Sequence, residues 1–312
     1  MSFAIKIEPC ADFKLIHIIN EDTKQQIVIS TKGGLLNHWL QPTNAGWFDI
    51  IDGNNFTQGW NHFEKNGFKS GKMSPFSCRL KNGKFTHEAT TYTIDKFYLG
   101  AHALHGIIYD ALFEIDHTEC NDEKGTITLS YKYHGIDKGF PFQYEIHIQW
   151  TFEKDNKVSV CTSLQNNDLK SFPMMDGWHP YFKLGENIDD CTIQFYNKGL
   201  LEYNSELIPT GNFIPNNEFE QAKALLDLEL DNGYLLADEN PKCTFENSRY
   251  KLVVTPDKHY AYLQLYTPPG RKSIAIENLS AAPDCFNNKM GLHIMQPQEV
   301  WSLTTQYQLF SK

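Results

Sequence analysis

The sequence predicts an all-β protein, a large antiparallel β-sandwich formed by a single domain over residues 1–312. Apolar and polar residues alternate with a period of two over long segments, which is the pattern of half-buried strands. Only residues 218–228 resemble a helix. The alternation of strands and helices that marks a parallel α/β sheet is therefore missing, and we expect one short helix at 218–228 among many strands.

The clearest predicted strand is residues 142–152, where every even position is apolar and every odd position is polar. Residues 126–133 and 157–165 repeat this pattern, and a turn at 154–157 joins two of the three, so they read as an antiparallel meander. Further strands are predicted at residues 15–19, 26–30, 191–195, 251–255, 260–266, 274–278 and 301–309. Since they reach both ends of the chain without a linker or repeat, one sandwich is favoured over two domains.

Charge and composition limit the partners of the chain. Lys and Arg number 28 against 38 Asp and Glu, a formal net charge of −10 that disfavours nucleic acid and anionic membranes and permits a neutral small-molecule ligand. The longest stretch without these residues, 33–48, is too short and too polar to span a membrane. No secretory signal is recognisable at the N-terminus, so a cytoplasmic location is expected. The oligomeric state stays open.

Several common cofactor and metal patterns are missing from the sequence. It contains no dinucleotide-binding glycine motif, no P-loop, no serine-hydrolase elbow and no zincin motif. The seven Cys are scattered without a Cys-x-x-Cys pair, and the twelve His do not cluster as metal ligands. Neither a cofactor nor a metal is predicted.

Three segments place polar or charged residues in tight turns flanked by apolar residues, where burial without a purpose would be costly. They are residues 104–106 (Leu-His-Gly), 176–182 (Asp-Gly-Trp-His-Pro-Tyr-Phe) and 274–287. In the third segment, Glu277 ends a strand of buried character. A desolvated carboxylate there has a pKa raised toward neutrality, as a general base requires.

In this order, the segments resemble the aldose 1-epimerase (mutarotase) family. Its members carry a Leu-His-Gly turn, a His-Pro-Tyr-Phe motif and a late Glu followed by Pro-Asp-x-x-Asn, which match residues 104–106, 179–182, Glu277 and 283–287. An Arg before a short Asn-Gly turn is matched by Arg79. The resemblance, from about residue 70 to 290, implies a galactose mutarotase-like β-supersandwich and the interconversion of the α and β anomers of a free hexose.

The resemblance also implies roles for individual residues. Glu277 corresponds to the general base and His179 to the general acid, while Arg79 and His105 match positions that hold the sugar. A sugar-gripping Asp is most similar to Asp231, with Asp227 as the alternative. For the sugar's C–H face, the sequence offers three stacking candidates, Trp178, Tyr181 and Phe286.

The ring-opening chemistry is consistent with the residues themselves. A base removes the O1 proton and an acid protonates ring O5, and neither step requires a metal or a redox cofactor.

Two loops whose course the sequence does not reveal, residues 46–71 and 188–217, are expected to shape the pocket.

Three alternatives remain open. A hexose-6-phosphate mutarotase would need a basic cluster near C6, against which the net charge of −10 counts. A non-catalytic sugar-binding or regulatory protein would retain the pocket, but Glu277 and His179 would not meet in one cleft. A glycosidase is the weakest alternative, since no spacing argument supports Glu277 and Asp284 as its carboxylate pair.

Overall fold

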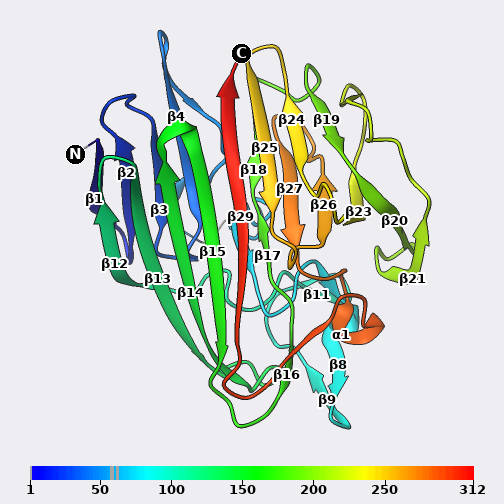
Figure 1. Ribbon diagram of the computed structural model, residues 1–312. Coiled ribbons are helices and arrows are strands. Elements are labelled where there is room, and N and C mark those ends of the chain that lie inside the picture. Colours follow the sequence, from blue (N-terminus) through cyan, green and yellow to red (C-terminus); the bar gives the residue numbers. More distant parts are fainter. Residues whose placement is uncertain (1, 57–59, 61–62) are drawn as a thin grey trace.

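Antiparallel strands packed in two layers make up the fold. The computed structural model describes residues 2–56, 60 and 63–312. One layer is a nine-stranded sheet with the order β12-β13-β14-β15-β29-β25-β24-β19-β22 (Figure 1). Its strands are β12 (Glu114–Cys120), β13 (Lys124–His134), β14 (Gln143–Glu153), β15 (Lys157–Asn166), β19 (Thr192–Phe195), β22 (Lys223–Ala224), β24 (Cys243–Glu246), β25 (Tyr250–Pro256) and β29 (Val300–Ser311).

Two further sheets form the second layer. The eight-stranded sheet has the order β21-β20-β23-β26-β27-β17-β6, with β18 pairing with β27. Its strands are β6 (Gly71–Met73), β17 (Gly177–His179), β18 (Tyr181–Phe182), β20 (Asn197–Tyr203), β21 (Pro209–Ile214), β23 (Asp231–Leu236), β26 (Tyr262–Tyr266) and β27 (Ile274–Leu279). The five-stranded sheet consists of β1 (Phe3–Cys10), β2 (Phe13–Asn20), β3 (Gln26–Ser30), β4 (Leu36–Thr43) and β5 (Gly46–Asp49).

Shorter elements complete the described chain. One three-stranded sheet has the order β10 (Tyr98–Leu99), β11 (His102–Leu104) and β7 (Arg79–Leu80). Two two-stranded sheets are the hairpin of β8 (Lys84–His87) with β9 (Thr90–Thr93) and the pair of β16 (Phe172–Met174) with β28 (His293–Met295), whose strands are distant in the chain. The helices are the 3-10 turns η3 (Lys81–Gly83) and η4 (Lys154–Asn156) and the α-helix α1 (Cys285–Asn288). Among the described residues, no helix is long and apolar enough to cross a membrane.

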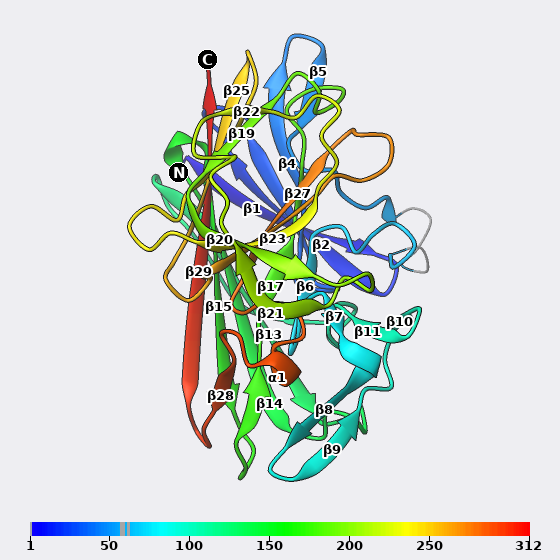
Figure 2. The same ribbon diagram turned by 90° about the vertical axis from the view of Figure 1, so that its right-hand side faces the viewer.

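In Figure 2, β29 and β15 of the nine-stranded sheet lie to the left of β27 and β6 of the eight-stranded sheet. Aromatic residues from both layers meet in the core between them. Trp150 of the nine-stranded sheet packs against Trp178 of the eight-stranded sheet with ring centroids 5.3 Å apart. Phe152 packs in the same way against Phe3 of the five-stranded sheet, at 5.7 Å. Thus both sheets of the second layer bury apolar side chains against one face of the nine-stranded sheet.

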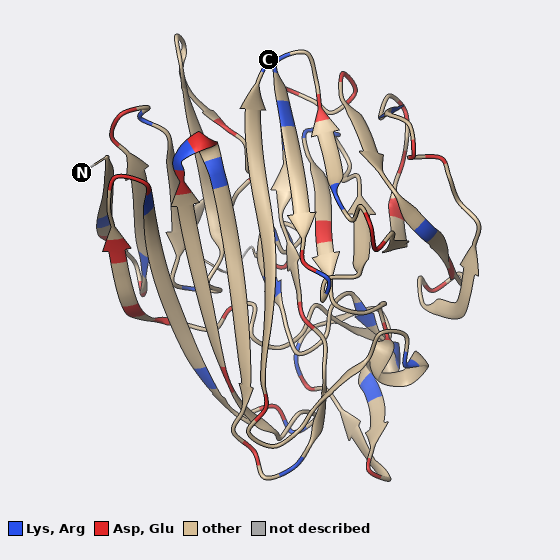
Figure 3. Cartoon of the chain, in the orientation of Figure 1, with Lys and Arg blue, Asp and Glu red and all other residues tan. Residues whose placement is uncertain are grey.

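The predicted strands are confirmed. All ten predicted segments fall on strands of the structure, and the meander is β13, β14 and β15 in antiparallel register. Along β14 the even-numbered residues point into the core and are buried, whereas most odd-numbered residues are partly or fully exposed. The positions of the charged residues along the chain fall mainly in the connections and toward strand ends (Figure 3). The all-β prediction therefore holds.

The predicted helix at residues 218–228 is wrong. The segment forms turns around the two-residue strand β22, which pairs with β19. Its apolar residues find separate partners: Phe219 stacks on Phe195 with centroids 4.9 Å apart, and the Leu225 N–H donates to the Cys191 carbonyl. Tertiary packing thus outweighs a helical propensity that is weak over so few residues.

The cysteines are all reduced in the structure. None of the seven forms a disulfide, and Cys191, Cys243 and Cys285 are buried. Buried free cysteines act as small apolar residues in the core.

Candidate functional site

The candidate site is a row of side chains across the outer face of the eight-stranded sheet. Gly177 pairs with Leu279 and Tyr181 pairs with Ala275, and the same register places His179 opposite Glu277. Glu277 in turn pairs with Gln264 of β26. Since paired residues in adjacent strands point to the same side, the three side chains form one row.

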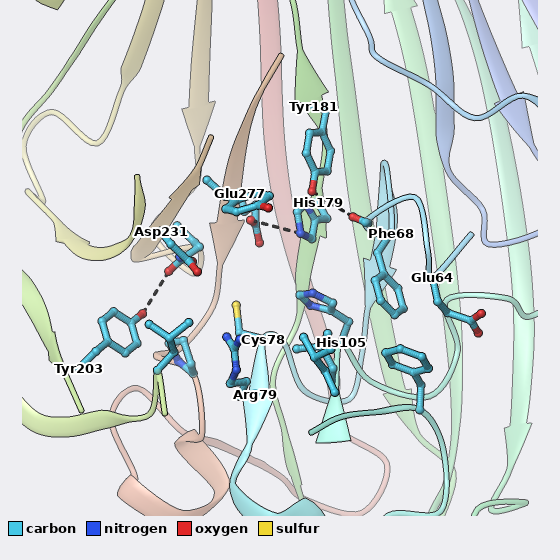
Figure 4. A pocket seen from close by; sticks show the side chains of 18 residues that line it. Glu64, Phe68, Cys78, Arg79, His105, His179, Tyr181, Tyr203, Asp231 and Glu277 are labelled. Carbon is cyan, nitrogen blue, oxygen red and sulfur yellow. Dashed lines mark hydrogen bonds and ion pairs between the residues drawn. The ribbon is translucent and has the colours of Figure 1, made fainter. Parts of the chain in front are cut away.

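His179 and Glu277 converge within this row (Figure 4). His179 Nε2 lies 3.5 Å from Glu277 Oε1, and the two side chains are 6% and 2% exposed. The remaining polar atoms, His179 Nδ1 and Glu277 Oε2, are buried and make no hydrogen bond within the protein. Buried polar atoms are nearly always satisfied, so unpartnered atoms on both groups are suited to receive a ligand.

Burial sets the protonation of this pair. Desolvation raises the pKa of Glu277 well above its ordinary value, and the negative charge of Asp231 adds to the effect. Desolvation also lowers the pKa of His179 to about 3. Both shifts disfavour charge, so burial favours a protonated Glu277 beside a neutral imidazole.

His105 and Arg79 reach the same cavity from the neighbouring three-stranded sheet. Leu104 of β11 pairs with Arg79 of β7, and the next residue, His105, adopts a left-handed conformation with φ 59°. Its ring lies edge-on to that of His179, with centroids 5.0 Å apart. Desolvation lowers the pKa of His105 well below its usual range, and its Nδ1 has no partner within the protein. It too is neutral and free to bind a ligand.

A glycine makes the turn after His105 possible. Gly106 has φ 79°, and a Cβ at this position would lie 2.3 Å from the Ser74 carbonyl oxygen. A side chain there would clash with backbone, so only Gly allows this close approach of the His105 turn to the segment before β7. In the Leu-His-Gly motif, Gly106 thus permits the close backbone contact with Ser74, and His105 contributes its side chain to the cavity.

Asp284 and Asn287 support the site without lining it. Asp284 Oδ1 accepts hydrogen bonds from the Lys81 N–H (2.8 Å) and from Asn287 Nδ2 (2.7 Å). Asn287 Nδ2 also donates to the Lys84 carbonyl. The late Pro-Asp-x-x-Asn motif thus holds the chain that carries Arg79. With Asp284 engaged in this way, the structure does not pair it with Glu277 as a second carboxylate in the cavity.

Asp231, rather than Asp227, lines the cavity. Asp231 Oδ1 accepts a hydrogen bond from Gln264 Nε2 at 2.9 Å, and the Tyr203 hydroxyl donates to Gln264 Oε1 at 3.1 Å. A Cβ on Gly233 would lie 2.5 Å from that hydroxyl, so the absence of a side chain makes room for it. This polar chain forms one end of the site.

The cavity that these groups line has a volume of about 230 Å³. The predicted site residues all line it: Glu277, His179, Arg79, His105 and Asp231. Residues that the sequence interpretation missed are Glu64, Gly67, Phe68, Cys78, Phe97, Leu99, Tyr203, Leu207, Gln264 and Tyr266. Gln264 could have been noticed as a polar residue within an apolar strand, whereas the others carry no local pattern.

The two loops expected to shape the pocket do contribute to it. Glu64 and Phe68 come from residues 46–71, of which 57–59 and 61–62 lie outside the described part of the chain. Tyr203 and Leu207 come from residues 188–217.

Of the three aromatic residues expected to stack on a sugar, only Tyr181 lines the cavity. Its ring is parallel to that of His179, with centroids 4.9 Å apart. Trp178 is wrong as a sugar platform because it points to the other face of the sheet, against Trp150. Phe286 is wrong too, since it packs in the core against Phe85.

The charges around the cavity are mainly acidic. Its described lining contains three carboxyl groups, those of Glu64, Asp231 and Glu277, and a single guanidinium, that of Arg79. Within the described residues, no group of three or more His, Cys, Asp or Glu side chains is arranged to hold a metal ion. The arrangement therefore offers an acid–base pair surrounded by hydrogen-bonding groups.

Comparisons with known proteins agree on one family. The aldose 1-epimerase family model matches residues 14–308. The chain is 24% identical over 229 residues to an aldose 1-epimerase of Streptococcus thermophilus, a match covering 69% of this chain and 64% of that protein. It is 20% identical over 231 residues to the uncharacterized protein YihR of Escherichia coli K12, covering 72% and 73% of the two chains.

Solved structures show the same fold. A galactose mutarotase-like protein from Clostridium acetobutylicum superposes with a TM-score of 0.85 at 18% identity, covering 100% of this chain and 99% of that one. A galactose 1-epimerase from Lactobacillus acidophilus NCFM gives a TM-score of 0.83 at 17% identity, with 99% and 98% coverage. At identities of 17–18%, these superpositions show a shared fold and nothing further.

Proposed function

This chain belongs to the aldose 1-epimerase family, and we propose that it interconverts the α and β anomers of a free, unphosphorylated hexose. The observation that carries the proposal is the convergence of Glu277 and His179, 3.5 Å apart in a buried cavity, each with an unpartnered polar atom. Ring opening requires one base and one acid within reach of neighbouring oxygen atoms, and this pair supplies both.

Reaction begins when the proton of the pair moves from Glu277 to His179. Because one group gains the proton that the other loses, no exchange with solvent is needed. Burial disfavours this charged form, whereas the hydroxyls of a bound sugar favour it by donating hydrogen bonds to the carboxylate and accepting them from the imidazolium. Binding thus generates a carboxylate base and an imidazolium acid together.

Glu277 then removes the proton from O1, and the electrons of the O1–H bond form the C1=O1 carbonyl. The C1–O5 bond breaks, and O5 takes the proton of His179. Rotation about C1–C2 turns the other carbonyl face toward O5. Reclosure reverses both proton transfers, so the protein returns to its starting state and the sugar emerges as the other anomer.

The remaining polar groups are suited to hold a neutral polyol. Arg79 and Asp231 offer bidentate hydrogen bonds to vicinal hydroxyls, and His105 offers a neutral ring nitrogen. Phosphate is a poor fit, because the described lining contains one Arg, no Lys and three carboxyl groups. This charge balance favours a free hexose over a hexose 6-phosphate.

The test is anomer exchange followed by polarimetry or NMR saturation transfer. Glucose, galactose and their 6-phosphates are compared with wild type, Glu277→Gln and the control Glu186→Gln, whose side chain is exposed away from the cavity. We expect acceleration with a free sugar that disappears in Glu277→Gln and survives in Glu186→Gln. Binding of these sugars without acceleration would instead support a non-catalytic sugar-binding protein.

A further inference from the structure

A second buried charged cluster lies on the opposite face of the sheet that carries the site. Lys72 of β6 and Asp176, the residue before β17, form an ion pair in which both side chains are 0% exposed. Neither residue lines the cavity. Since Lys72 pairs with Trp178 in the sheet, its side chain points with the Trp178 ring into the core between the layers.

Lys72 is held from several directions. Its Nζ donates to Asp176 Oδ1 and lies 3.4 Å from both the Thr162 hydroxyl and the Gly177 carbonyl oxygen. The same ammonium lies 4.3 Å from the centre of the Trp178 ring. Because Thr162 belongs to β15, these contacts tie the start of β17 to the nine-stranded sheet.

Asp176 ties the two strands of the candidate acid and base together. Its N–H donates to Ser280 Oγ, and its carbonyl accepts from the Ser280 N–H, both at 2.9 Å. Its Oδ1 also accepts a hydrogen bond of 2.6 Å from the Tyr260 hydroxyl. Asp176 lies three residues before His179, and Ser280 lies three residues after Glu277. The cross-link is therefore beside the row that contains the pair.

Stability alone does not account for this ion pair. Removing two charges from water costs about as much as their attraction returns, and replacing a buried pair by apolar residues is often neutral or stabilising by about 1–4 kcal/mol. Burial lowers the pKa of Lys72 to about 8 against the opposing attraction of Asp176, which shows how strongly the core disfavours the charge. An ion pair in the core, beside the strands that carry His179 and Glu277, therefore points to a role in holding those strands in place.

We propose that the Lys72–Asp176 ion pair positions the two reacting groups: it fixes β17 against β27 and so sets the 3.5 Å separation of His179 Nε2 and Glu277 Oε1. Lys72 and Asp176 are positioning residues, since neither touches the cavity. The inference rests on the proposed function, because the pair it positions is the proposed acid and base. A displacement of 1 Å in such a pair costs on the order of 10²-fold in rate.

The decisive variant replaces the whole cluster by apolar residues of similar size, Lys72→Met/Asp176→Leu/Tyr260→Phe. Since no buried charge or hydroxyl is left unpaired, we expect a free energy of unfolding close to that of wild type. We expect kcat for anomer exchange to fall about 10²-fold. KM should change less than about threefold, because Arg79 and Asp231 lie on β7 and β23, outside the cluster.

Two further variants serve as comparisons. The control Lys157→Met/Glu153→Leu removes a half-buried ion pair at the β14–β15 turn. Neither residue lines the cavity, so this control should leave kcat unchanged. Asp176→Asn preserves the shape of the carboxylate and removes its charge, so it should lower kcat in the same direction by a smaller factor. It also provides the test should the apolar variant not fold.

A second measurement is independent of activity. The imidazole resonances of ¹³C-histidine-labelled protein are recorded, and that of His179 is assigned by its loss in His179→Asn. We expect the His179 signal to shift and broaden in the apolar variant and in Asp176→Asn, and to stay in place in the control. If wild type accelerates no sugar, the proposed function fails, and this spectrum still tests the positioning.

An unchanged His179 signal in folded variants would overturn the inference. So would a kcat within about threefold of wild type, or a rise in KM that accounts for the whole loss of kcat/KM.

Discussion

The two faces of the eight-stranded sheet both bury charged residues, but they treat them differently. On the inner face, Lys72 and Asp176 form an ion pair whose groups also contact Tyr260 and Thr162. On the cavity face, burial favours the neutral forms of His179 and Glu277, which share one proton. An unpartnered polar atom does not distinguish the faces, since Asp176 Oδ2 has no partner either. The faces differ in charge: Lys72 and Asp176 stabilise opposite charges by direct contact within the core, whereas His179 and Glu277 line a cavity in which a ligand can reach them.

The largest effect is expected when the proposed acid on the cavity face, His179, is removed. For His179→Asn we expect kcat for anomer exchange to fall about 10²- to 10⁴-fold, the usual contribution of a general acid. Combining it with Glu277→Gln should lower kcat little further, because the two groups act as a unit. Polarimetry of both single variants and the double variant checks this. Additive losses would contradict a coupled acid–base pair.

The two faces should also differ in stability. Asp176→Leu leaves Lys72 buried without its counter-charge, so we expect a loss of about 3–5 kcal/mol in the free energy of unfolding. Glu277→Gln removes an uncompensated buried carboxyl and should leave stability equal or raised. Urea unfolding of the two variants beside wild type measures both. Equal losses would mean that Glu277 has a structural partner comparable to that of Asp176.

The raised pKa of Glu277 predicts the pH dependence of activity. The proposed pair needs one proton, which rests on Glu277 and moves to His179, so kcat/KM should fall as pH rises through the raised pKa of Glu277 and the pair loses that proton. A pH–rate profile of wild type locates this alkaline limb. A profile that instead falls only as pH decreases through an ordinary glutamate pKa would show that Glu277 is ionised and well solvated in the working protein.

The same shift has a consequence for stability. A carboxyl whose folded pKa is raised contributes stability below its unfolded pKa, and this contribution is lost as pH rises through the folded pKa. The free energy of unfolding of wild type relative to Glu277→Gln should therefore decrease over that window. Urea titrations at several pH values measure the difference, and a constant difference would contradict burial as the cause.

The smallest expected effect concerns the end of the cavity at Asp231. Asp231→Asn keeps the shape and weakens a charge-assisted hydrogen bond to a hydroxyl, which is worth about 1.5 kcal/mol or roughly tenfold in KM. Asp227→Asn is the matched control, since Asp227 does not line the cavity. Steady-state kinetics distinguish the two. Equal KM values for Asp231→Asn and wild type would remove Asp231 from the binding groups.

Predictability differs between the two layers for a physical reason. The long strands β13, β14 and β15 each bury one face, so their period of two is visible in the sequence. In contrast β17, which carries His179, is three residues long and buried throughout. A segment this short shows no period, and its place in the sheet depends on pairing with β6 and β27.

The candidate site was predictable where motifs exist. His105, His179 and Glu277 were identified from short motifs that resemble a family, and all three line the cavity. Glu64 and Leu207 were missed because they come from loops in which no local pattern marks the residue that turns inward. Trp178 was misplaced because neighbours in a strand point to opposite faces, and the motif alone does not show which face holds the cavity.

By itself, the sequence determined the all-β class, the long strands and the types of reacting residues, because alternation and short motifs are local properties. Only the tertiary structure decided that His179 stands opposite Glu277, that Asp231 rather than Asp227 faces them, and that Lys72 and Asp176 lie beneath. These relations depend on strand register between segments up to about a hundred residues apart in the chain. Register is set by the packing of whole sheet faces, which no single segment encodes.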